Sequence, residues 1–280
     1  METGISLCMV VKNEAEYLED CLKHISPWVR ELIVVDTGSS DDTPAIAERC
    51  GARVFSFPWN NDFSAARNFS LRQANEPWIL VLDADERLAL REAEKLSSLV
   101  RFASAPAAFS FLQRNYLNGS GQLTWDQSWQ ANTHQYEEGR GYAGYIDIAV
   151  ARLFPRHPQV GFSGCVHESV EGALAASGIP LKQSGLVLHH YGQVRDSARM
   201  SAKMHLYLEL GMNKLEQEPV SARAHFELGI QHQALKQYAE AIPHFVAAVK
   251  HDASFAIADL YAGICHSRLK QYGPAGRHLE

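Results

Sequence analysis

Two acidic residues one position apart follow a short apolar run, and their types and spacing suit a metal ion. Residues 78–82 have the pattern of a buried strand, and Asp83-Ala84-Asp85 follows directly. Because alternate residues of a strand point to the same side, the carboxylates of Asp83 and Asp85 can face one cleft, where they repel each other unless a cation lies between them. Mg²⁺ and Mn²⁺ prefer oxygen ligands of this kind and commonly bridge to a diphosphate. The alternative is a solvated acidic turn, and the position after a buried strand favours the metal site.

Asp36 is another acid at the end of an apolar run, here residues 32–35. An acid at the carboxyl end of a parallel strand can accept a hydrogen bond from a ribose hydroxyl or a nucleotide base. Asp41 and Asp42 follow in a polar turn, and we expect them to cap the helix that begins at Thr43-Pro44. The sequence therefore places a candidate nucleotide contact near the candidate metal site.

The elements that must position these acids alternate between strands and helices over the first hundred residues. The apolar patterns predict strands at 5–11, 32–35, 53–57 and 78–82, and helices at 14–25, 43–51 and 64–74. This alternation favours a parallel sheet flanked by helices, in which ligands bind at the carboxyl ends of the strands.

The middle of the chain, about residues 104–192, is richer in aromatic and glycine residues and reads as an irregular extension of the sheet. Strands are expected at 108–114, 149–154 and 186–190. Aromatic faces stack on sugar rings, yet large aromatic side chains more often lie in a core. Both roles stay open for the aromatic residues of this segment: Trp125, Trp129, Tyr136, Tyr142 and Tyr145.

The last ninety residues have a helical pattern with an internal repeat. Lys236-Gln237-Tyr238 recurs as Lys270-Gln271-Tyr272, 34 positions later, which is the period of a tetratricopeptide repeat. The second copy stops inside its second helix at Glu280, so we expect the repeat array to be cut short there, or the last residues to derive from a vector.

Four motifs in this order resemble a family 2 glycosyltransferase. They are SLCMVVKNE at 6–14, LIVVDTGSSDDT at 32–43, FSAARN at 63–68 and LVLDADE at 80–86. The resemblance implies an α/β GT-A domain, a mixed sheet flanked by helices, over residues 1–198. An all-α tetratricopeptide-like region would follow over residues 199–280, as in the subgroup in which such repeats follow the catalytic domain.

The resemblance also implies an activity and its participants. It implies a metal-dependent, inverting transfer of a sugar from a nucleotide-diphosphate donor, most commonly a UDP-sugar, to a saccharide or protein acceptor. The metal would be Mn²⁺ or Mg²⁺, which neutralises the diphosphate leaving group. The helical repeats would offer a surface to a protein partner.

Site residues are carried over from the family position by position. The nucleotide-binding set is Val11, Lys12, Asn13, Glu14, Asp36, Arg67, Asp83 and Ala84. The metal set is Asp83, Asp85 and His190, and Asp85 is also assigned to the catalytic group. The alternatives for Arg67 are a salt bridge to Asp62 or a charge on the helix surface. His190 is favoured over His189 because His190-Tyr191-Gly192 resembles the ending of the subgroup.

Later motifs, at 152–154 and 161–168, resemble the acceptor side of the subgroup. Inverting members need a general base that removes a proton from the acceptor hydroxyl. Glu168 is the candidate base, with Asp147 as the alternative, because the usual Asp of the wider family is absent. The pair His167-Glu168 could instead only shape its loop by hydrogen bonding.

Composition excludes several classes of protein. With 26 Lys+Arg, 32 Asp+Glu and a net charge of −6, the chain lacks the basic excess that is typical of nucleic-acid binders. No apolar run approaches the length of a transmembrane segment, and the five scattered cysteines fit a reducing cytoplasm. Two alternative functions stay open: a nucleotidyltransferase, and a non-catalytic repeat scaffold with a vestigial GT-A domain.

Overall fold

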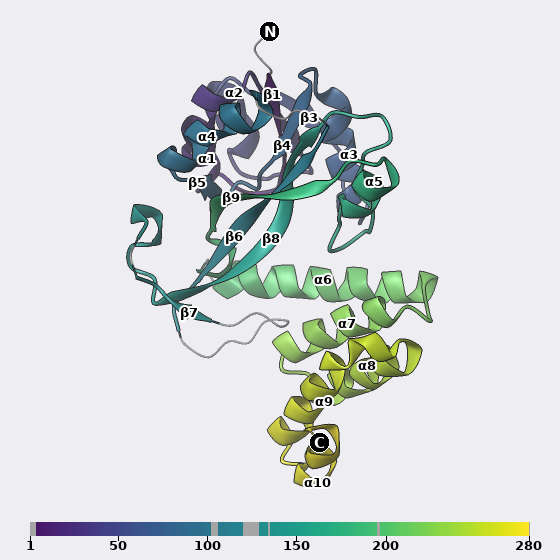
Figure 1. The fold of residues 1–280 in the computed structure, drawn as a ribbon. Coiled ribbons are helices and arrows are strands. Elements are labelled where there is room, and N and C mark those ends of the chain that lie inside the picture. Colours follow the sequence, from purple (N-terminus) through teal and green to yellow (C-terminus); the bar gives the residue numbers. More distant parts are fainter. Residues whose placement is uncertain (1–3, 102–105, 120–128, 134, 195–196, 280) are drawn as a thin grey trace. The chain divides into compact units, whose positions relative to one another are not determined.

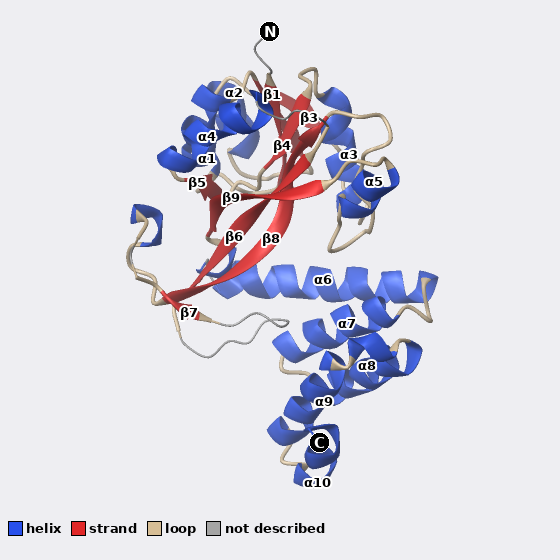
Figure 2. Ribbon diagram, in the orientation of Figure 1, coloured by secondary structure: helices blue, strands red, loops and turns tan. Residues whose placement is uncertain are grey.

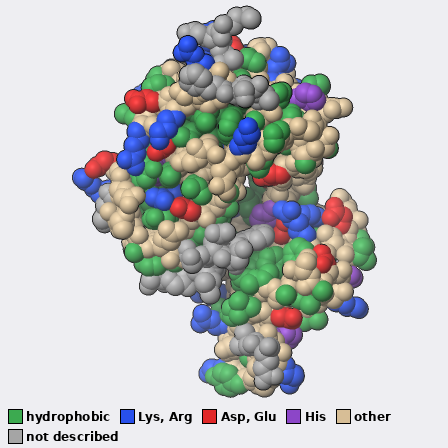
Figure 3. Space-filling model, in the orientation of Figure 1, with side chains coloured by type: hydrophobic (Ala, Val, Ile, Leu, Met, Phe, Trp, Pro, Cys, Tyr) green, Lys and Arg blue, Asp and Glu red, His purple; other side chains and the backbone are tan. Residues whose placement is uncertain are grey.

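The chain divides into two units in the computed structural model, residues 1–195 and residues 196–280. The structure describes residues 4–101, 106–119, 129–133, 135–194 and 197–279. Trp125, an aromatic residue of the middle segment, lies outside the described residues. Within them, no helix combines the length and the apolar character needed to cross a bilayer. On the face in Figure 3, acidic and basic side chains are interspersed.

Parallel strands form the first half of the sheet, as the apolar runs predict. They are β1 (Ile5–Val11), β2 (Glu31–Asp36), β3 (Arg53–Ser56) and β4 (Trp78–Val81). β2 lies between β1 and β3, and β4 pairs with β1 on the other side. β1 and β4 are buried along nearly their whole length because helices cover both faces, which explains their continuous apolar sequence.

The second half of the sheet makes it mixed, as the GT-A resemblance implies. β8 (Gly144–Pro155) is antiparallel to both β4 and β6 (Ala108–Leu117), and β6 is parallel to β9 (Leu181–His190). β5 (Glu86–Leu88) closes this edge, and the short β7 (Gln130–Ala131) pairs with β8. The strand order is β3-β2-β1-β4-β8-β6-β9-β5.

Helices cover both faces of the parallel half (Figures 1 and 2). Residues of α1 (Leu18–Ile25), α2 (Thr43–Arg49) and α4 (Leu90–Arg101) share one apolar core with Leu80 of β4. Residues of α3 (Phe63–Gln73) and α5 (Glu171–Ala176) pack with Ile79 and Val81 in the other core. Alternate residues of β4 thus pack into the cores on opposite faces of the sheet.

Several predicted boundaries differ from the structure. The helix expected from residue 14 begins at Leu18, because Asn13 has a positive φ of 56° and Glu14–Tyr17 forms a turn closed by hydrogen bonds to the Glu14 carbonyl. The helix expected to end at Gly51 ends at Arg49, and the strands expected at 149–154 and 186–190 are longer. Two elements of the structure, α4 and β5, were not predicted from the sequence.

The second unit is helical. Its helices are α6 (Ser197–Gln217), α7 (Ala222–Ala234), α8 (Tyr238–His251), α9 (Ile257–Arg268) and α10 (Tyr272–Leu279). Phe226, Phe245 and Tyr261 form its core together with small residues of α8 and α9. Short 3₁₀ turns are Ser26–Trp28, Glu137–Gly139 and Gly192–Val194 in the first unit and Ala253–Phe255 in the second.

A histidine stack inside the helical unit makes its stability depend on pH. The His244 ring lies 5.4 Å from the His232 ring and 5.5 Å from the His225 ring, measured between centroids. Burial, followed by the charges of His232 and His225, lowers the pKa of His244 from 6.5 to about 4. The unfolded chain therefore binds a proton first as the pH falls, so stability is lost progressively between these two values.

We expect the helical unit to unfold at a lower temperature at pH 5 than at pH 7.5. Substitution of His244 by glutamine removes the group that titrates and should reduce this pH dependence. The measurement is thermal unfolding followed by circular dichroism, with an NMR titration of the histidine rings. An equal pH dependence in His244→Gln would contradict the assignment.

Candidate active site

The carboxyl ends of parallel strands bring several sequence-predicted residues to one edge of the sheet. β1 and β2 end together, with Val11 paired in register with Asp36. β4 pairs with the other side of β1, and Leu82 and Asp83 follow its last residue. This edge is where an open parallel sheet binds ligands.

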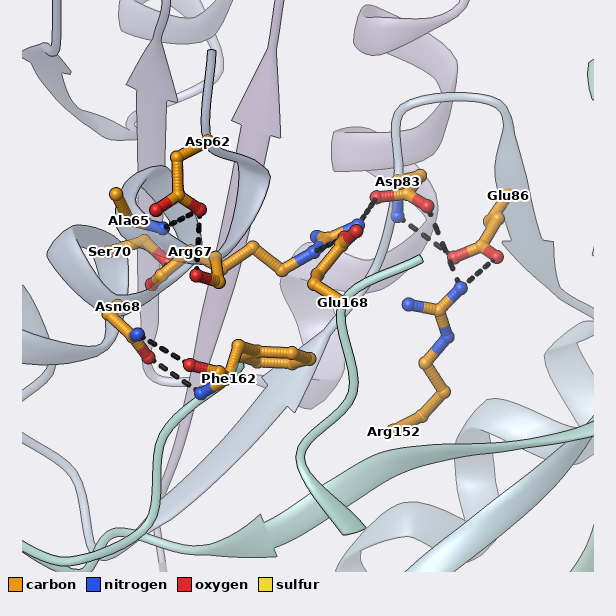
Figure 4. A network of polar contacts seen from close by, with 11 residues as sticks. Asp62, Ala65, Arg67, Asn68, Ser70, Asp83, Glu86, Arg152, Phe162 and Glu168 are labelled. Atoms are coloured by element: carbon orange, nitrogen blue, oxygen red, sulfur yellow. Dashed lines mark hydrogen bonds and ion pairs between the residues drawn. The ribbon is translucent and has the colours of Figure 1, made fainter. Parts of the chain in front are cut away.

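Arg67 joins Asp83 to Glu168 (Figure 4). Its Nη2 atom donates to Asp83 Oδ1 at 2.8 Å, and its Nε atom donates to Glu168 Oε1 at 2.7 Å. The guanidinium also lies over the Phe162 ring, 5.6 Å from the centroid. One arginine of α3 therefore holds the first acid of the DxD motif and the candidate base.

The alternative salt bridge from Arg67 to Asp62 does not form. Asp62 is instead the N-cap of α3, where its carboxylate accepts hydrogen bonds from the Ala65 amide at 3.0 Å and from the Ser64 hydroxyl at 2.7 Å. Capping satisfies an otherwise unpaired amide at the start of the helix. Arg67, one turn further along α3, is thereby left to reach the two acids of the site.

The ion pair between Arg67 and Asp83 shifts the pKa of both side chains. Burial alone would raise the pKa of the Asp83 carboxyl, but the charges of Arg67 and then Arg152 outweigh it and hold that pKa well below its usual range. Burial opposes the charge of Arg67, yet Asp83 and Glu168 raise its pKa. Asp83 and Arg67 are therefore both charged near neutral pH.

A buried ion pair beneath the DxD motif was not anticipated from the sequence. Glu86 accepts a hydrogen bond from the Asp83 amide at 2.9 Å, and its other oxygen is bound by Arg152 and Gln113. Arg152 Nη2 also lies 3.6 Å from Asp83 Oδ2. A charged residue inside the apolar strand at 149–154 is the signal that could have indicated this partner, because a buried charge needs a counter-charge.

His190 lies beside Asp85, as the choice between the two histidines predicts. The His190 Nε2 atom is 3.3 Å from Asp85 Oδ2, and its Nδ1 atom is 2.6 Å from Asn115 Oδ1. Asn115 Nδ2 donates to the carbonyls of Gln113 and Ile146, so the amide oxygen faces the imidazole. Nδ1 is therefore the ring nitrogen that faces Asn115, and Nε2 is the ring nitrogen that faces Asp85.

His189 points to the other face of β9 and belongs to an aromatic cluster. Its Nδ1 atom lies 2.7 Å from the Tyr116 hydroxyl, and burial lowers its pKa to about 3. Tyr116 also stacks on Tyr142, and Tyr136 lies edge-on to His189. These aromatic residues pack around a buried histidine, which accords with the core role considered for the middle segment.

The three predicted metal ligands do not converge in this structure. Among the described residues, no group of three His, Cys, Asp or Glu side chains could hold a metal ion. Asp85 and His190 meet, whereas the Asp83 carboxylate faces Arg67 and Arg152. The pair that meets combines a carboxylate and an imidazole nitrogen, which are ligands suited to Mn²⁺.

The structure distinguishes the two candidate bases. Both oxygens of Asp147 accept hydrogen bonds from Arg114, at 2.9 and 2.8 Å. Among the described residues, the hydrogen bond to the Glu168 carboxylate comes from Arg67 and ends at Oε1, which leaves Oε2 for a proton. Glu168 is therefore better arranged than Asp147 to act as a base.

The candidate nucleotide loops are connected to each other. Asp36 accepts hydrogen bonds from the Gly38 and Ser39 amides, and the Ser39 hydroxyl accepts one from the Asn13 amide at 2.8 Å. The Glu14 amide donates to the Thr43 hydroxyl at 2.7 Å. The Lys12 side chain is exposed and Ala84 is buried.

One prediction in this region is wrong. Asp42 makes no side-chain capping bond to α2, whereas Asp41 accepts hydrogen bonds from the Thr43 amide and from the Ala15 amide. Asp41 therefore ties the start of α2 to the loop after β1.

Comparison with known proteins gives a family and a fold. Residues 6–156 match the family described as Glycosyl transferase family 2. A TPR repeat-containing protein of Synechococcus elongatus is 36% identical over 202 residues, covering 69% of this chain and 43% of that protein. The lipopolysaccharide core biosynthesis glycosyltransferase LpsC of Rhizobium meliloti is 28% identical over 142 residues, covering 49% and 52%. The chain thus spans about half the length of these curated relatives.

A solved structure supports the architecture. TarS residues 1–349 of S. aureus, in complex with UDP-GlcNAc, matches with a TM-score of 0.50 and 13% identity, covering 97% of this chain and 89% of that one. This likeness concerns the fold. The mixed sheet flanked by helices matches the GT-A fold that the motifs imply.

Proposed function

Because this chain belongs to glycosyl transferase family 2, we propose that it transfers a sugar from a nucleotide-diphosphate donor, a UDP-sugar, to a hydroxyl of a saccharide or protein acceptor. The observation that carries this proposal is the array Asp83–Arg67–Glu168 at the carboxyl edge of the sheet. In this array, two nitrogens of the Arg67 guanidinium bind Asp83, the acid assigned to the donor side, and Glu168, the proposed base.

The loops after β1 and β2 would bind the nucleotide. Asp36 ends β2 at this edge, and Val11, Lys12, Asn13 and Glu14 form the neighbouring segment. The Gly38 and Ser39 amides of its own loop hold the Asp36 carboxylate in a fixed position, where it can accept from a uracil or ribose group. The Asn13 amide joins this loop to the segment after β1 through the Ser39 hydroxyl. TarS, which shares the fold, was solved with UDP-GlcNAc, and this supports uracil as the base.

Asp85 and His190 would hold a divalent cation, Mn²⁺ or Mg²⁺. Their facing oxygen and nitrogen atoms fit such an ion, since Asn115 orients the imidazole as second-shell partners of metal-bound histidines do. Such ions are commonly bound by one or two protein carboxylates together with substrate phosphates. When bound, the cation would stabilise the negative charge of the leaving diphosphate. Asp83 as a ligand stays a prediction.

Glu168 would act on the acceptor. Its Oε2 atom takes the proton of the acceptor hydroxyl while the oxygen forms a bond to the anomeric carbon. The bond from that carbon to the diphosphate oxygen breaks, and its electron pair leaves with UDP. Attack from the face opposite the leaving group inverts the anomeric centre. Arg67 fixes the position of the Glu168 carboxylate throughout.

The helical unit is proposed to be a pair of tetratricopeptide-like repeats. His232 Nδ1 lies 2.8 Å from Gln237 Oε1, and the same pair recurs as His266 and Gln271 at 2.7 Å. The turn residues Lys236 and Lys270 both have φ of 60°. Helix ends with the same contacts and backbone support a structural repeat of 34 residues. Binding of a protein partner stays a prediction.

The test of the proposed function is a thermal-shift panel of UDP-, GDP- and dTDP-sugars with Mn²⁺, followed by an assay of nucleotide release. Binding to the native state raises the unfolding temperature, so a UDP-sugar should give the largest shift. Release of UDP by hydrolysis, with water as the acceptor, then measures turnover. If no UDP-sugar stabilises the protein and none is hydrolysed, the proposal fails, as it would for a vestigial scaffold.

Removal of the metal gives a separate expected result. We expect EDTA to abolish UDP release and Mn²⁺ to restore it. Asp85→Asn and His190→Gln should each weaken Mn²⁺ binding in the presence of UDP by about 10- to 100-fold, measured by calorimetry. His205→Gln, at an exposed position of α6, is the matched control. Unchanged Mn²⁺ affinity in both site variants would contradict the ligand assignment.

A further inference from the structure

We propose that Asn68 is a positioning residue that holds Glu168 in place by binding the backbone of its loop. This rests on the proposed function in so far as Glu168 is the base. The base loop is defined here as residues 161–169. Asn68 stands next to Arg67 on α3, so consecutive residues of one helix contact the two ends of the base loop.

The Asn68 amide pairs with both backbone groups of Phe162. Its Nδ2 atom donates to the Phe162 carbonyl at 2.8 Å, and its Oδ1 atom accepts from the Phe162 amide at 2.7 Å. This double contact gives Phe162 the pair of hydrogen bonds that a neighbouring strand would otherwise provide. Figure 4 shows it beside the bonds from Arg67 to Glu168 and Asp83.

Backbone hydrogen bonds also hold the rest of the base loop in shape. A contact that fixes Phe162 therefore also helps to fix the position of Glu168. Ser163 and Ser169 exchange two backbone hydrogen bonds of 2.9 and 3.0 Å, which close the loop on itself. Gly164 with φ of 98° and His167 with φ of 53° make the tight reversal. The Phe63 amide donates to the Cys165 carbonyl at 3.0 Å and adds a second tie to α3.

An open pocket borders this end of the loop, although the Phe162 ring packs against the core beside Phe154. A cavity of about 460 Å³ lies beside Asn68 and Gly161. A Cβ atom at Gly161 would come within 2.8 Å of Asn68 Oδ1, so glycine there permits the close approach of the amide. The two hydrogen bonds of Asn68 therefore act together with the contact between Arg67 and the Phe162 ring to keep Phe162 against α3.

Few side chains can replace this amide. Alanine removes both hydrogen bonds. Aspartate can still accept from the Phe162 amide, but it cannot donate to the carbonyl and places a negative charge beside that oxygen. Both changes should let the base loop move away from Arg67 and displace the Glu168 carboxylate from its working position.

The experiment measures UDP release from the best UDP-sugar of the panel, with Mn²⁺, for Asn68→Ala and Asn68→Asp. We expect kcat to fall about 10- to 100-fold, the cost of a displacement of roughly 1 Å, while KM for the donor changes less than about 3-fold. Hydrogen exchange of residues 161–169 should become faster in both variants while exchange in β1 and β4 stays unchanged. Asn75→Ala, which removes an exposed amide bound to Glu31 at 2.7 Å, is the control that should keep full activity.

Combination with Glu168→Gln separates this inference from the proposed function. If Asn68 acts through Glu168, Asn68→Ala should cost little further activity in the Glu168→Gln background, because the residues work as a unit. A full additional loss there, or unchanged kcat and exchange in both Asn68 variants, would overturn the inference. If Glu168→Gln alone keeps full turnover, the proposed base is wrong, and faster exchange of residues 161–169 would then still support the structural tie by Asn68.

Discussion

Glu168→Gln will lower UDP release about 10²- to 10⁴-fold, which is the range that a positioned general base contributes. Glutamine has nearly the same shape, and its carbonyl oxygen can still accept the hydrogen bond from Arg67 Nε. It cannot take a proton from an acceptor hydroxyl or from water. The loss should therefore appear in kcat, while the affinity for the UDP-sugar stays within about 3-fold.

The measurement pairs steady-state kinetics with calorimetry of donor binding. Asp147→Asn is the matched control, because it makes the same chemical change at the alternative base. Asp147 is engaged by Arg114 on both oxygens, so its loss should affect turnover far less. A large loss of kcat in Asp147→Asn together with normal turnover in Glu168→Gln would reverse the assignment.

Arg67→Met will abolish measurable turnover and destabilise the catalytic unit. Methionine keeps much of the length and packing of the side chain but removes the charge that Asp83 and Glu168 share. The Arg67 side chain is only 12% exposed, so both acids would lose a desolvated partner. Removal of one partner from a buried ion pair typically costs about 3–5 kcal/mol. Arg67→Lys should rescue little, because one ammonium group cannot donate from two fixed positions.

The dependence of stability on pH checks the electrostatic part of this prediction. Arg67 and Arg152 hold the folded-state pKa of Asp83 below its ordinary value of 3.8, so the resulting stability is present above that value and is lost as the pH falls below it. In Arg67→Met, the pKa of Asp83 should rise, and acid unfolding should begin at a higher pH. Tryptophan fluorescence follows this transition, because all five tryptophans lie in residues 1–195.

The control is Arg72→Met on the same helix. Arg72 is exposed and lies over the Phe69 ring at 5.7 Å, away from the two acids. Its substitution should leave turnover and acid stability nearly unchanged. Equal behaviour of Arg67→Met and Arg72→Met would show that the charge of Arg67 is not needed at the site.

Local sequence pattern was sufficient for the parallel half of the sheet. Runs such as residues 5–11 and 78–82 are apolar at nearly every position, because strands that are buried on both faces have no polar side. Asp36 and Asp83 were placed at strand ends for the same reason, since polarity returns where a strand leaves the core. The order of the antiparallel half was not accessible, because pairing of β6, β8 and β9 depends on contacts far apart in the chain.

The sequence by itself determined the family motifs, the DxD motif after a buried strand and the preference for His190. These follow from short segments, and the preference for His190 came from the resemblance of His190-Tyr191-Gly192 to the ending of the subgroup. In the structure, His190 lies beside Asp85. Only the tertiary structure showed that Arg67 contacts both Asp83 and Glu168 and that Asp147 is paired with Arg114. Glu168 lies 101 residues after Arg67, and Asp147 is engaged through a cross-strand pair with Arg114. Such contacts arise when separate elements pack against one another, and no local periodicity records them.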